Sequence, residues 1–436
     1  MSRLGTALVV LLALLAAPLV AHEVPDRVEI AVLLRPEHGR MQIVARVPAN
    51  ALIDFLLPTQ EAGHWVDLTN ADALAAQAAS VWIGDRISVR ENGVALPSPQ
   101  LRKIRLSRVD DPAFTTFDRA LARINGPPLS PDTLVLQEQV TVDALLELPI
   151  TSPDASFTFL PQFGRLGVLV YTRLTYLVPD GRIQRFDYEG DPPEFALDPS
   201  LGDTLRRFVT AGASYFFTVP ECLLFAVCIA LVFRRSVAPL AAFSLTFAVT
   251  QVLALLLADA WLASSPWMSV LCDAFVAAAV VSAGIEAIVA APGRGLGLAA
   301  GAGALFGVAC WSAFEPTAQF GGAHSLAASL AFAAGVVLCD LAALITSAWA
   351  TRLLRFFRAA QAVGIVIAAI AIHISCQRML ARVDALTLVG IPVAPRQLVM
   401  WAALAAIVIG LLAWLQRHAG AGLPQAALRA PAHPPE

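Results

Sequence analysis

The stretch TVPECLLFAV, positions 218 to 227, places Pro220, Glu221 and Cys222 side by side within a long apolar run. A carboxylate in the middle of a membrane span costs roughly 2.5 to 3.5 kcal/mol even on lenient insertion scales. Glu221 must therefore face the interior of a helix bundle or a water-filled cavity, and Pro220 frees a backbone carbonyl that could line such a cavity. A carboxylate beside a thiol in this setting is suited to holding a cation or a proton.

Other residues with ligand chemistry interrupt the later apolar runs, and helical rise of ~1.5 Å per residue predicts their depth. The residues expected near the outer ends of their helices are Asp273, Cys310 and His373. Those expected deeper are Glu221, Cys222 and Asp340. Glu286 lies ~20 Å from Asp273 along the same helix and cannot share its site. One hypothesis is that the outer and the deeper residues form two successive layers along the path of a cation or proton. The alternative is that these polar residues only form hydrogen bonds between helices.

The amino-acid composition indicates that these apolar runs lie in a lipid bilayer. Of the 436 residues, 57% are hydrophobic and 14% are charged, and the mean hydropathy of +0.68 is far above that of a soluble protein. Most charged residues lie before position 206, whereas apolar stretches of about 20 residues, enough to cross a bilayer, repeat after it. The lipid bilayer is therefore an expected partner. The net charge of −3 and the absence of a basic stripe exclude nucleic acid.

The apolar half predicts an α-helical polytopic membrane bundle of seven helices. The predicted spans are 208–233, 237–258, 267–291, 295–314, 324–350, 357–380 and 397–416. Six of them form a block over 206–380, and residues 381–416 supply a loop and the seventh helix. The Pro-rich tail at 417–436 is expected to be a disordered cytoplasmic segment.

The first half predicts an exported domain. Residues 1–21 have the layout of a secretory signal, with an uncleaved first transmembrane helix as the alternative. Residues 22–205 predict a β-rich, sandwich-like domain, because alternating runs flank Pro-Glu-His-Gly, Asn-Gly and Pro-Asp-Gly turn signals. A helical composition at 70–85, with Asn70 as its N-cap, predicts one short helix among the strands.

Arginine residues predict the orientation of the spans in a bacterial inner membrane. If the β-rich domain is periplasmic, arginines fall in the cytoplasmic loops, and the first two outer loops carry none. This places the C-terminus in the cytoplasm. The third outer loop, with Arg378, Arg382 and Arg396, is the exception to the rule.

The order of these features resembles the HupE/UreJ family, in its branch with an N-terminal extracytoplasmic domain. The family's first helix carries a pattern like G-x-x-H-x-x-x-G-x-D-H-L-L-F, and GASYFFTVPECLLF is similar to it, with Glu221 at the Asp position and Cys222 at the second His position. Four later segments resemble further family motifs in the right order; they are AAFSLTFAVTQVLAL, CDAFVAAAVVSAGIEAI, ALFGVACWSAF and AFAAGVVLCDLA. The resemblance covers roughly residues 22 to 380.

This resemblance implies a membrane protein of nickel or cobalt handling, but several metal-binding histidines of the family are replaced. Tyr215 and Phe247 stand at two His positions and Val337 at a Glu position, and none of them suits nickel. Cys222 and Cys310 replace histidines with softer ligands, which favours Cu(I) or Zn over Ni or Co. A transition-metal ion is thus the expected substrate, although buried cysteines also pack well as small apolar residues.

The chain carries no P-loop, G-x-S-x-G or H-E-x-x-H motif, so an enzyme is not expected. Two functions remain. One is a permease for a metal cation or similar small solute. The other is a membrane-anchored binding or assembly factor whose exported domain recognises a periplasmic protein partner. A membrane enzyme without a recognisable motif is a distant third.

Overall fold

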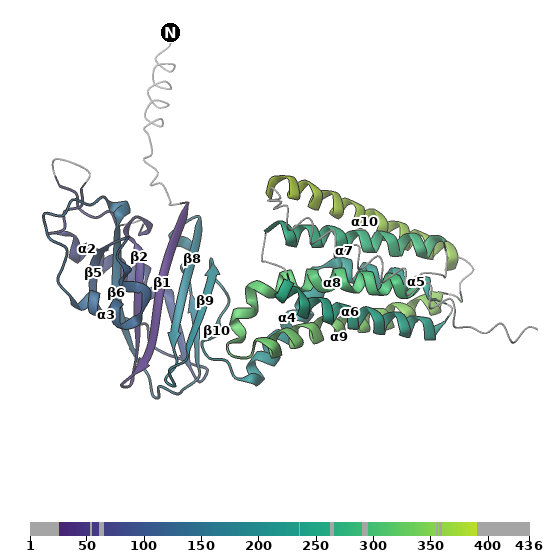
Figure 1. Ribbon diagram of the computed structural model, residues 1–436, viewed down its shortest axis with the longest axis horizontal. Coiled ribbons are helices and arrows are strands. Elements are labelled where there is room, and N and C mark those ends of the chain that lie inside the picture. Colours follow the sequence, from purple (N-terminus) through teal and green to yellow (C-terminus); the bar gives the residue numbers. More distant parts are fainter. Residues whose placement is uncertain are drawn as a thin grey trace, which may run out of the picture. The chain divides into compact units, whose positions relative to one another are not determined.

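The computed structural model describes residues 26–52, 55–60, 65–234, 236–261, 266–289, 295–354, 356 and 360–389. The chain divides into two compact units, Met1–Pro199 and Ser200–Glu436, and each is described by itself (Figure 1). The predicted signal at 1–21, seventh helix at 397–416 and tail at 417–436 lie outside the described residues.

The first unit is β-rich, as predicted, and contains two sheets. The larger sheet has the strand order β5-β6-β2-β1-β8-β9 and the smaller one the order β10-β7-β3-β4. The strands are β1 (Arg27–Glu37), β2 (Arg40–Pro48), β3 (Ile87–Glu91), β4 (Val94–Ala95), β5 (Gln100–Arg108), β6 (Val140–Pro149), β7 (Phe157–Pro161), β8 (Leu169–Leu177), β9 (Ile183–Glu189) and β10 (Phe195–Ala196). The helices are α2 (Ala71–Trp82) and α3 (Phe117–Asn125), with short 3-10 turns η1 (Ala49–Ala51), η2 (Gly84–Arg86), η3 (Pro112–Thr115), η4 (Gln137–Gln139) and η5 (Gly164–Leu166).

The local turn signals lie where the hairpins form. His38 and Gly39 take positive φ between β1 and β2, and Asn92 and Gly93 do so between β3 and β4. The predicted short helix is α2. Asn70 stands at its N-cap position, but its side chain donates to Asp67 and does not cap the helix. The alternation of apolar and polar residues did not predict the parallel pairing of β1 with β8, because the two strands are distant in sequence.

The second unit is helical. Its helices are α4 (Leu201–Thr218), α5 (Pro220–Val232), α6 (Val237–Trp261), α7 (Pro266–Val289), α8 (Gly295–Ala318), α9 (Ser325–Leu354) and α10 (Ala360–Val389), with one 3-10 turn, η6 (Gln319–Gly321). Among the described residues, five helices are long and apolar enough to cross a membrane, or six if the bent pair α4 and α5 counts as one span. This is compatible with an integral membrane protein.

Two predicted spans differ from the structure. The run 208–233 is not one helix: α4 ends at Thr218, α5 begins at Pro220, and the chain bends by 73° between them. Pro220 has no N–H and fits the first position of a new helix, whereas inside a continuous helix it would break a hydrogen bond. The run 357–380 is too short, because α10 continues to Val389 through residues that favour helix. Arg378 and Arg382 are therefore helical residues, not loop residues.

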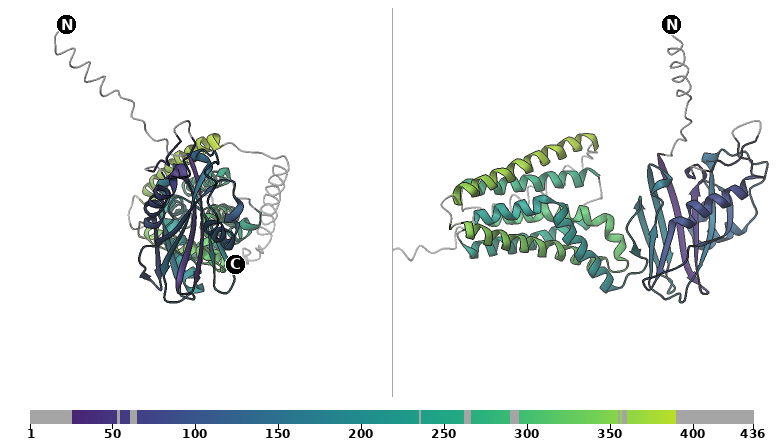
Figure 2. Two further views of the ribbon diagram at one scale, coloured as in Figure 1. Left: turned by 90° about the vertical axis from the view of Figure 1, so that its left-hand side faces the viewer. Right: turned by 180° about the vertical axis from the view of Figure 1, so that it is seen from behind.

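Glycines let the helices approach closely. α6 packs along α8, α4 along α9 and α10 along α7, as Figures 1 and 2 show. A Cβ on Gly303 or Gly307 of α8 would overlap carbonyl oxygens of α6, and one on Gly335 of α9 would overlap the carbonyl of Val209. Small residues at helix crossings are the usual way in which membrane helices make tight contacts. These contacts fix the backbone that carries the interior polar residues.

Candidate functional site

Two ion pairs join α10 to the carboxylates of neighbouring helices. Arg378 Nε donates to Glu221 Oε1, and Arg382 Nη2 lies 3.1 Å from Asp273 Oδ2. The Glu221 side chain is 6% exposed, whereas those of Arg378 and Arg382 are 38% and 41% exposed. Because the two arginines are separated by four positions, they lie about 6 Å apart along α10, on one face. The exceptions to the loop-arginine rule thus have a structural role as partners of interior carboxylates.

The break between α4 and α5 positions Glu221. Val219 has extended backbone angles, and Pro220, Glu221 and Cys222 form the first turn of α5. An acidic residue in the first turn is favoured by the free N–H groups of a helix N-terminus. Glu221 Oε2 has no hydrogen-bond partner among the described residues, although the atom is buried. Glu221 is therefore held at a helix start and by Arg378, and one of its acceptors is left unused.

A second polar centre lies among α6, α8 and α9. Gln251 Nε2 donates to Asp340 Oδ2 at 3.0 Å and contacts Cys310 Sγ at 3.8 Å. The residues Gln251, Asp340 and Cys310 are 2%, 4% and 1% exposed, and we call them the Gln251 centre. Among the described residues, Asp340 forms no ion pair with a basic side chain, and Gln251 Oε1 has no partner. The centre therefore contains a carboxylate, a thiol and a free amide oxygen, all removed from solvent.

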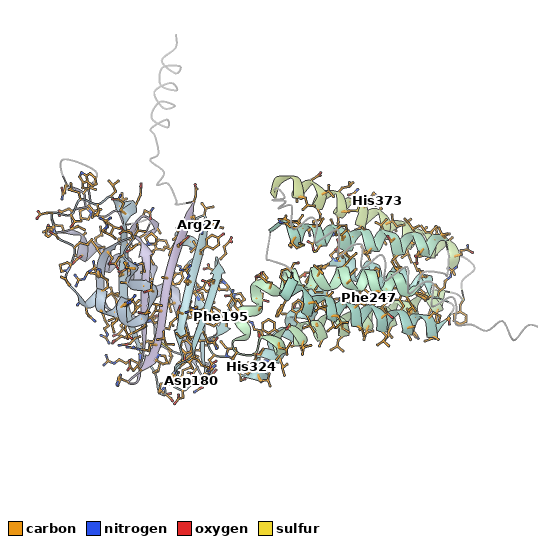
Figure 3. The ribbon with its side chains drawn as sticks, in the orientation of Figure 1. Arg27, Asp180, Phe195, Phe247, His324 and His373 are labelled. Atoms are coloured by element: carbon orange, nitrogen blue, oxygen red, sulfur yellow. The ribbon has the colours of Figure 1, made fainter. Side chains whose placement is uncertain are left out.

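Two further helices contribute groups to the surroundings of the Gln251 centre. The Tyr215 hydroxyl of α4 hydrogen-bonds with Cys310, and Cys222 of α5 is within electrostatic range of both Asp340 and Cys310. Phe225, Phe247 and neighbouring aromatic rings form an apolar core beside Cys222. Figure 3 labels Phe247 in the interior of the helical unit. Five helices thus converge around one polar centre in an otherwise apolar interior.

The predicted division into an outer and a deeper layer is wrong. Cys310 and Asp340, assigned to different layers, share Gln251 as a partner. Glu221 and Asp273, also assigned to different layers, pair with arginines one turn apart on α10. The depths of Glu221 and Cys222 were counted along one straight helix from position 208, and the bend before Pro220 makes that count invalid. Cys310 and Asp340 lie on other helices, α8 and α9, and are joined by the long side chain of Gln251 from α6.

Two predicted site residues are not brought into these groups. His373 is exposed on α10, where its Nε2 lies 3.3 Å from Gln377 Nε2, and Figure 3 labels it on that helix. Glu286 is half-buried on α7, about 20 Å from Asp273 by helical rise. Gln251, Arg378 and Arg382 are the members that the sequence reading missed. The sequence does carry one signal for these three residues. Each is a polar or charged side chain in, or next to, a run that is otherwise apolar enough to span a membrane.

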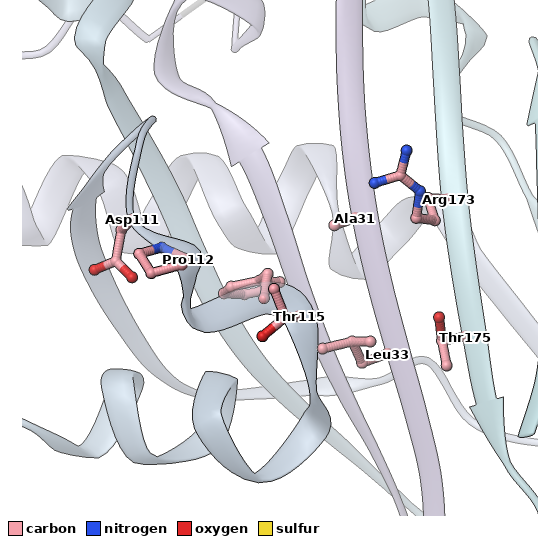
Figure 4. Close-up of a pocket in the computed structure, with 8 residues that line it drawn as sticks. Ala31, Leu33, Asp111, Pro112, Thr115, Arg173 and Thr175 are labelled. Carbon is pink, nitrogen blue, oxygen red and sulfur yellow. The ribbon is translucent and has the colours of Figure 1, made fainter.

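The β-rich unit has a cavity of its own, of about 210 Å³, shown in Figure 4. It lies between η3 with the preceding loop and strands β1 and β8. Its lining is Ala31, Leu33, Asp111, Pro112, Phe114, Thr115, Arg173 and Thr175. One wall is fixed by a buried ion pair, because Arg46 binds Asp143 at 2.7 Å and also donates to the Asp111 carbonyl at 2.6 Å.

Within the described part of the chain, no three His, Cys, Asp or Glu residues form a group that could hold a metal ion. The Gln251 centre supplies two residues of these types, plus an amide. No family model, no curated protein and no solved structure matches the chain.

Proposed function

We propose that the protein is a permease-like integral membrane protein that carries a transition-metal cation through the polar interior of its helical unit. The observation that carries the proposal is Asp340, a carboxylate 4% exposed among apolar helices without a basic partner among the described residues. A charged side chain at membrane depth is costly and typically marks an ion or substrate pathway. Asp340 is thus the group on which transport should depend.

The two ion pairs of α10 support the same proposal, because they show interior carboxylates that have a basic partner, whereas Asp340 has none among the described residues. Glu221 and Asp273 are each compensated by an arginine of α10, so neither needs a cation from solution. Asp340 is hydrogen-bonded to an amide and remains uncompensated. The resemblance to the HupE/UreJ family adds the expectation of a metal cation as substrate. It also adds the expected setting, a bacterial inner membrane with the β-rich unit in the periplasm and the C-terminus in the cytoplasm.

Asp340→Asn tests this function, because it keeps the shape of the side chain and removes its charge. Cells that express the full chain or the variant are supplied with Cu, Zn, Ni or Co, and the accumulated metal is measured by mass spectrometry. We expect the wild type to change the accumulation of at least one ion and Asp340→Asn to abolish that change. Asp384→Asn, at an exposed position on α10, is the matched control. Equal accumulation in the wild type, Asp340→Asn and empty cells would overturn the permease proposal.

A membrane-anchored binding factor is the second candidate, and the cavity of Figure 4 favours it. In that case the β-rich unit would bind a periplasmic partner, and the helical unit would serve as an anchor. An anchor tolerates Asp340→Asn but not a change in the cavity wall, such as Arg173→Ala. Loss of function in Arg173→Ala, with Asp340→Asn unaffected, would therefore favour the anchor.

A further inference from the structure

The Gln251 centre contains a carboxyl group, a thiol and an amide, which are groups that bind different cations with different strength. Asp340 contributes a carboxyl group that carries one negative charge when ionised, Cys310 contributes a thiol, and the Gln251 amide reaches both of them through a single nitrogen. The carboxylate and the thiol therefore converge on one point. In the structure the amide N–H group occupies that point, as a positively polarised donor between two acceptors.

The unused oxygen of Gln251 is the second observation that points to a ligand. Gln251 is 2% exposed, and its Oε1 has no hydrogen-bond partner among the described residues. A buried polar atom left unsatisfied costs about 1–3 kcal/mol. Rotation of the amide would exchange its nitrogen and oxygen and present Oε1 beside Asp340 and Cys310. Oε1 would then face the Asp340 carboxylate, and a cation held between these two acceptors would remove their repulsion.

We infer that Gln251, Asp340 and Cys310 form a binding site for one univalent, thiophilic cation of the Cu(I) or Ag(I) type. This inference rests on the proposed function and names the class of its substrate. Soft thiol ligands favour such ions over harder ones. Divalent zinc usually needs four ligands in a tetrahedral set, and the described residues provide no group of three His, Cys, Asp or Glu for it.

Charge balance gives the same answer. When the ion binds, a bond forms to Cys310 Sγ, the S–H bond breaks and the proton moves to the Asp340 carboxylate, with no change of oxidation state. A univalent ion then leaves the centre neutral. A divalent ion would leave it with one positive charge in an apolar interior, which is strongly unfavourable. Among the described residues, the other titratable groups within electrostatic range are Tyr215 of α4, Cys222 of α5 and Cys339 of α9, and all three are neutral in their protonated forms.

Silver is the probe, because Ag(I) needs no reductant. The full chain is purified in detergent and titrated calorimetrically with Ag(I), Zn(II) and Ni(II). We expect one strong Ag(I) site per chain and no comparable Zn(II) or Ni(II) site. Cys310→Ser and Asp340→Asn should each weaken Ag(I) binding by about tenfold or more. Cys228→Ser should leave it unchanged, because Cys228 is equally buried but packs in the apolar core.

The number of protons released on Ag(I) binding tests whether Asp340 accepts the thiol proton. A purely structural role of Asp340 would leave this number unchanged in the variant. In the wild type the thiol proton stays on Asp340, so less than one proton should reach the buffer for each Ag(I) bound. In Asp340→Asn that proton has no acceptor and should be released at high Ag(I). If both proteins release equal numbers of protons, the transfer to Asp340 is overturned.

Gln251→Glu provides a second test, in which the expected result is a gain of metal binding and not a loss. It adds a second carboxylate to the centre and should create affinity for Zn(II), which the wild type lacks. If Zn(II) or Ni(II) binds the wild type more tightly than Ag(I) through Asp340 and Cys310, the univalent class is wrong but the proposed permease stands. If all variants bind Ag(I) alike, the site is wrong. The cell accumulation experiment tests the permease independently of both results.

Discussion

At the residue scale, Arg378 compensates the Glu221 carboxylate and itself carries a charge within a candidate membrane span. Its partner is 6% exposed, so removal of the arginine would leave a buried carboxylate without a counter-charge. The pair as a whole contributes less to stability than the loss of one member costs, because both charges must be desolvated.

We therefore predict that Arg378→Gln lowers the free energy of unfolding by about 3–5 kcal/mol. The double variant Glu221→Gln with Arg378→Gln should recover most of this loss. Thermal unfolding of the full chain in detergent measures both effects. Arg206→Gln is the matched control, because Arg206 pairs with Asp203 on the exposed surface of α4. A double variant as unstable as Arg378→Gln alone would contradict the charge-compensation argument.

Glu91 is one residue at which acid should weaken the β-rich unit. Burial by itself would raise the pKa of Glu91, but hydrogen bonds from the Thr151 hydroxyl and from the backbone N–H groups of Thr151 and Ser152 outweigh burial and lower it. A carboxyl whose pKa is lower in the folded chain stabilises the fold above the unfolded pKa. That stabilisation is lost as the pH falls through the folded pKa.

Glu91→Gln should therefore reduce the stability of the β-rich unit near neutral pH and reduce its further loss of stability on acidification. The decline in the wild type should begin near 4.5, the ordinary pKa of glutamate, and continue below it. Hydrogen exchange of the amides at 151 and 152, followed from neutral pH to about pH 3, measures the effect. The exposed Glu138→Gln is the control. Parallel pH curves for wild type and Glu91→Gln would refute the assignment.

At the scale of elements, the contact of α6 with α8 decides where Gln251 lies. Gly307 of α8 meets the carbonyl oxygen of Gln251 itself, and Gly303 meets Phe247 and Thr250 one turn earlier. A side chain at Gly307 would push α6 away and carry Gln251 with it. The break between α4 and α5 acts at the same scale, because it determines that Glu221 begins a helix.

Gly307→Leu should therefore destabilise the helical unit by about 1–3 kcal/mol, as other overpacking changes do. It should also weaken Ag(I) binding. Gly301→Ala is the control on the same helix, because a Cβ there meets nothing within 4 Å. Thermal unfolding and silver titration in detergent report the two effects. Equal unfolding temperatures for the two variants would show that the tight crossing is not required.

At the scale of the whole molecule, arginine placement still predicts the orientation in the membrane. Phosphatase fusions after residue 200 and within 259–266 should be active outside. Fluorescent-protein fusions at 292–294 and 352–356 should report the inside. Arg378 and Arg382 no longer count against this orientation, because both pair with carboxylates of the helical unit. An outside result at 292–294 would mean that the orientation, or the third span, is wrong.

The sequence by itself determined the β-rich character of the first unit, its hairpins and the apolar helices of the second, because periodicity, turn residues and hydropathy are local properties. It also identified Glu221, Cys222, Cys310 and Asp340 as interior polar residues. Only the tertiary structure decided their partners. Gln251 joins Cys310 to Asp340, and Arg378 joins Glu221, through side chains from helices distant in sequence. Such contacts depend on helix bends and crossings, which spacing along one helix does not encode.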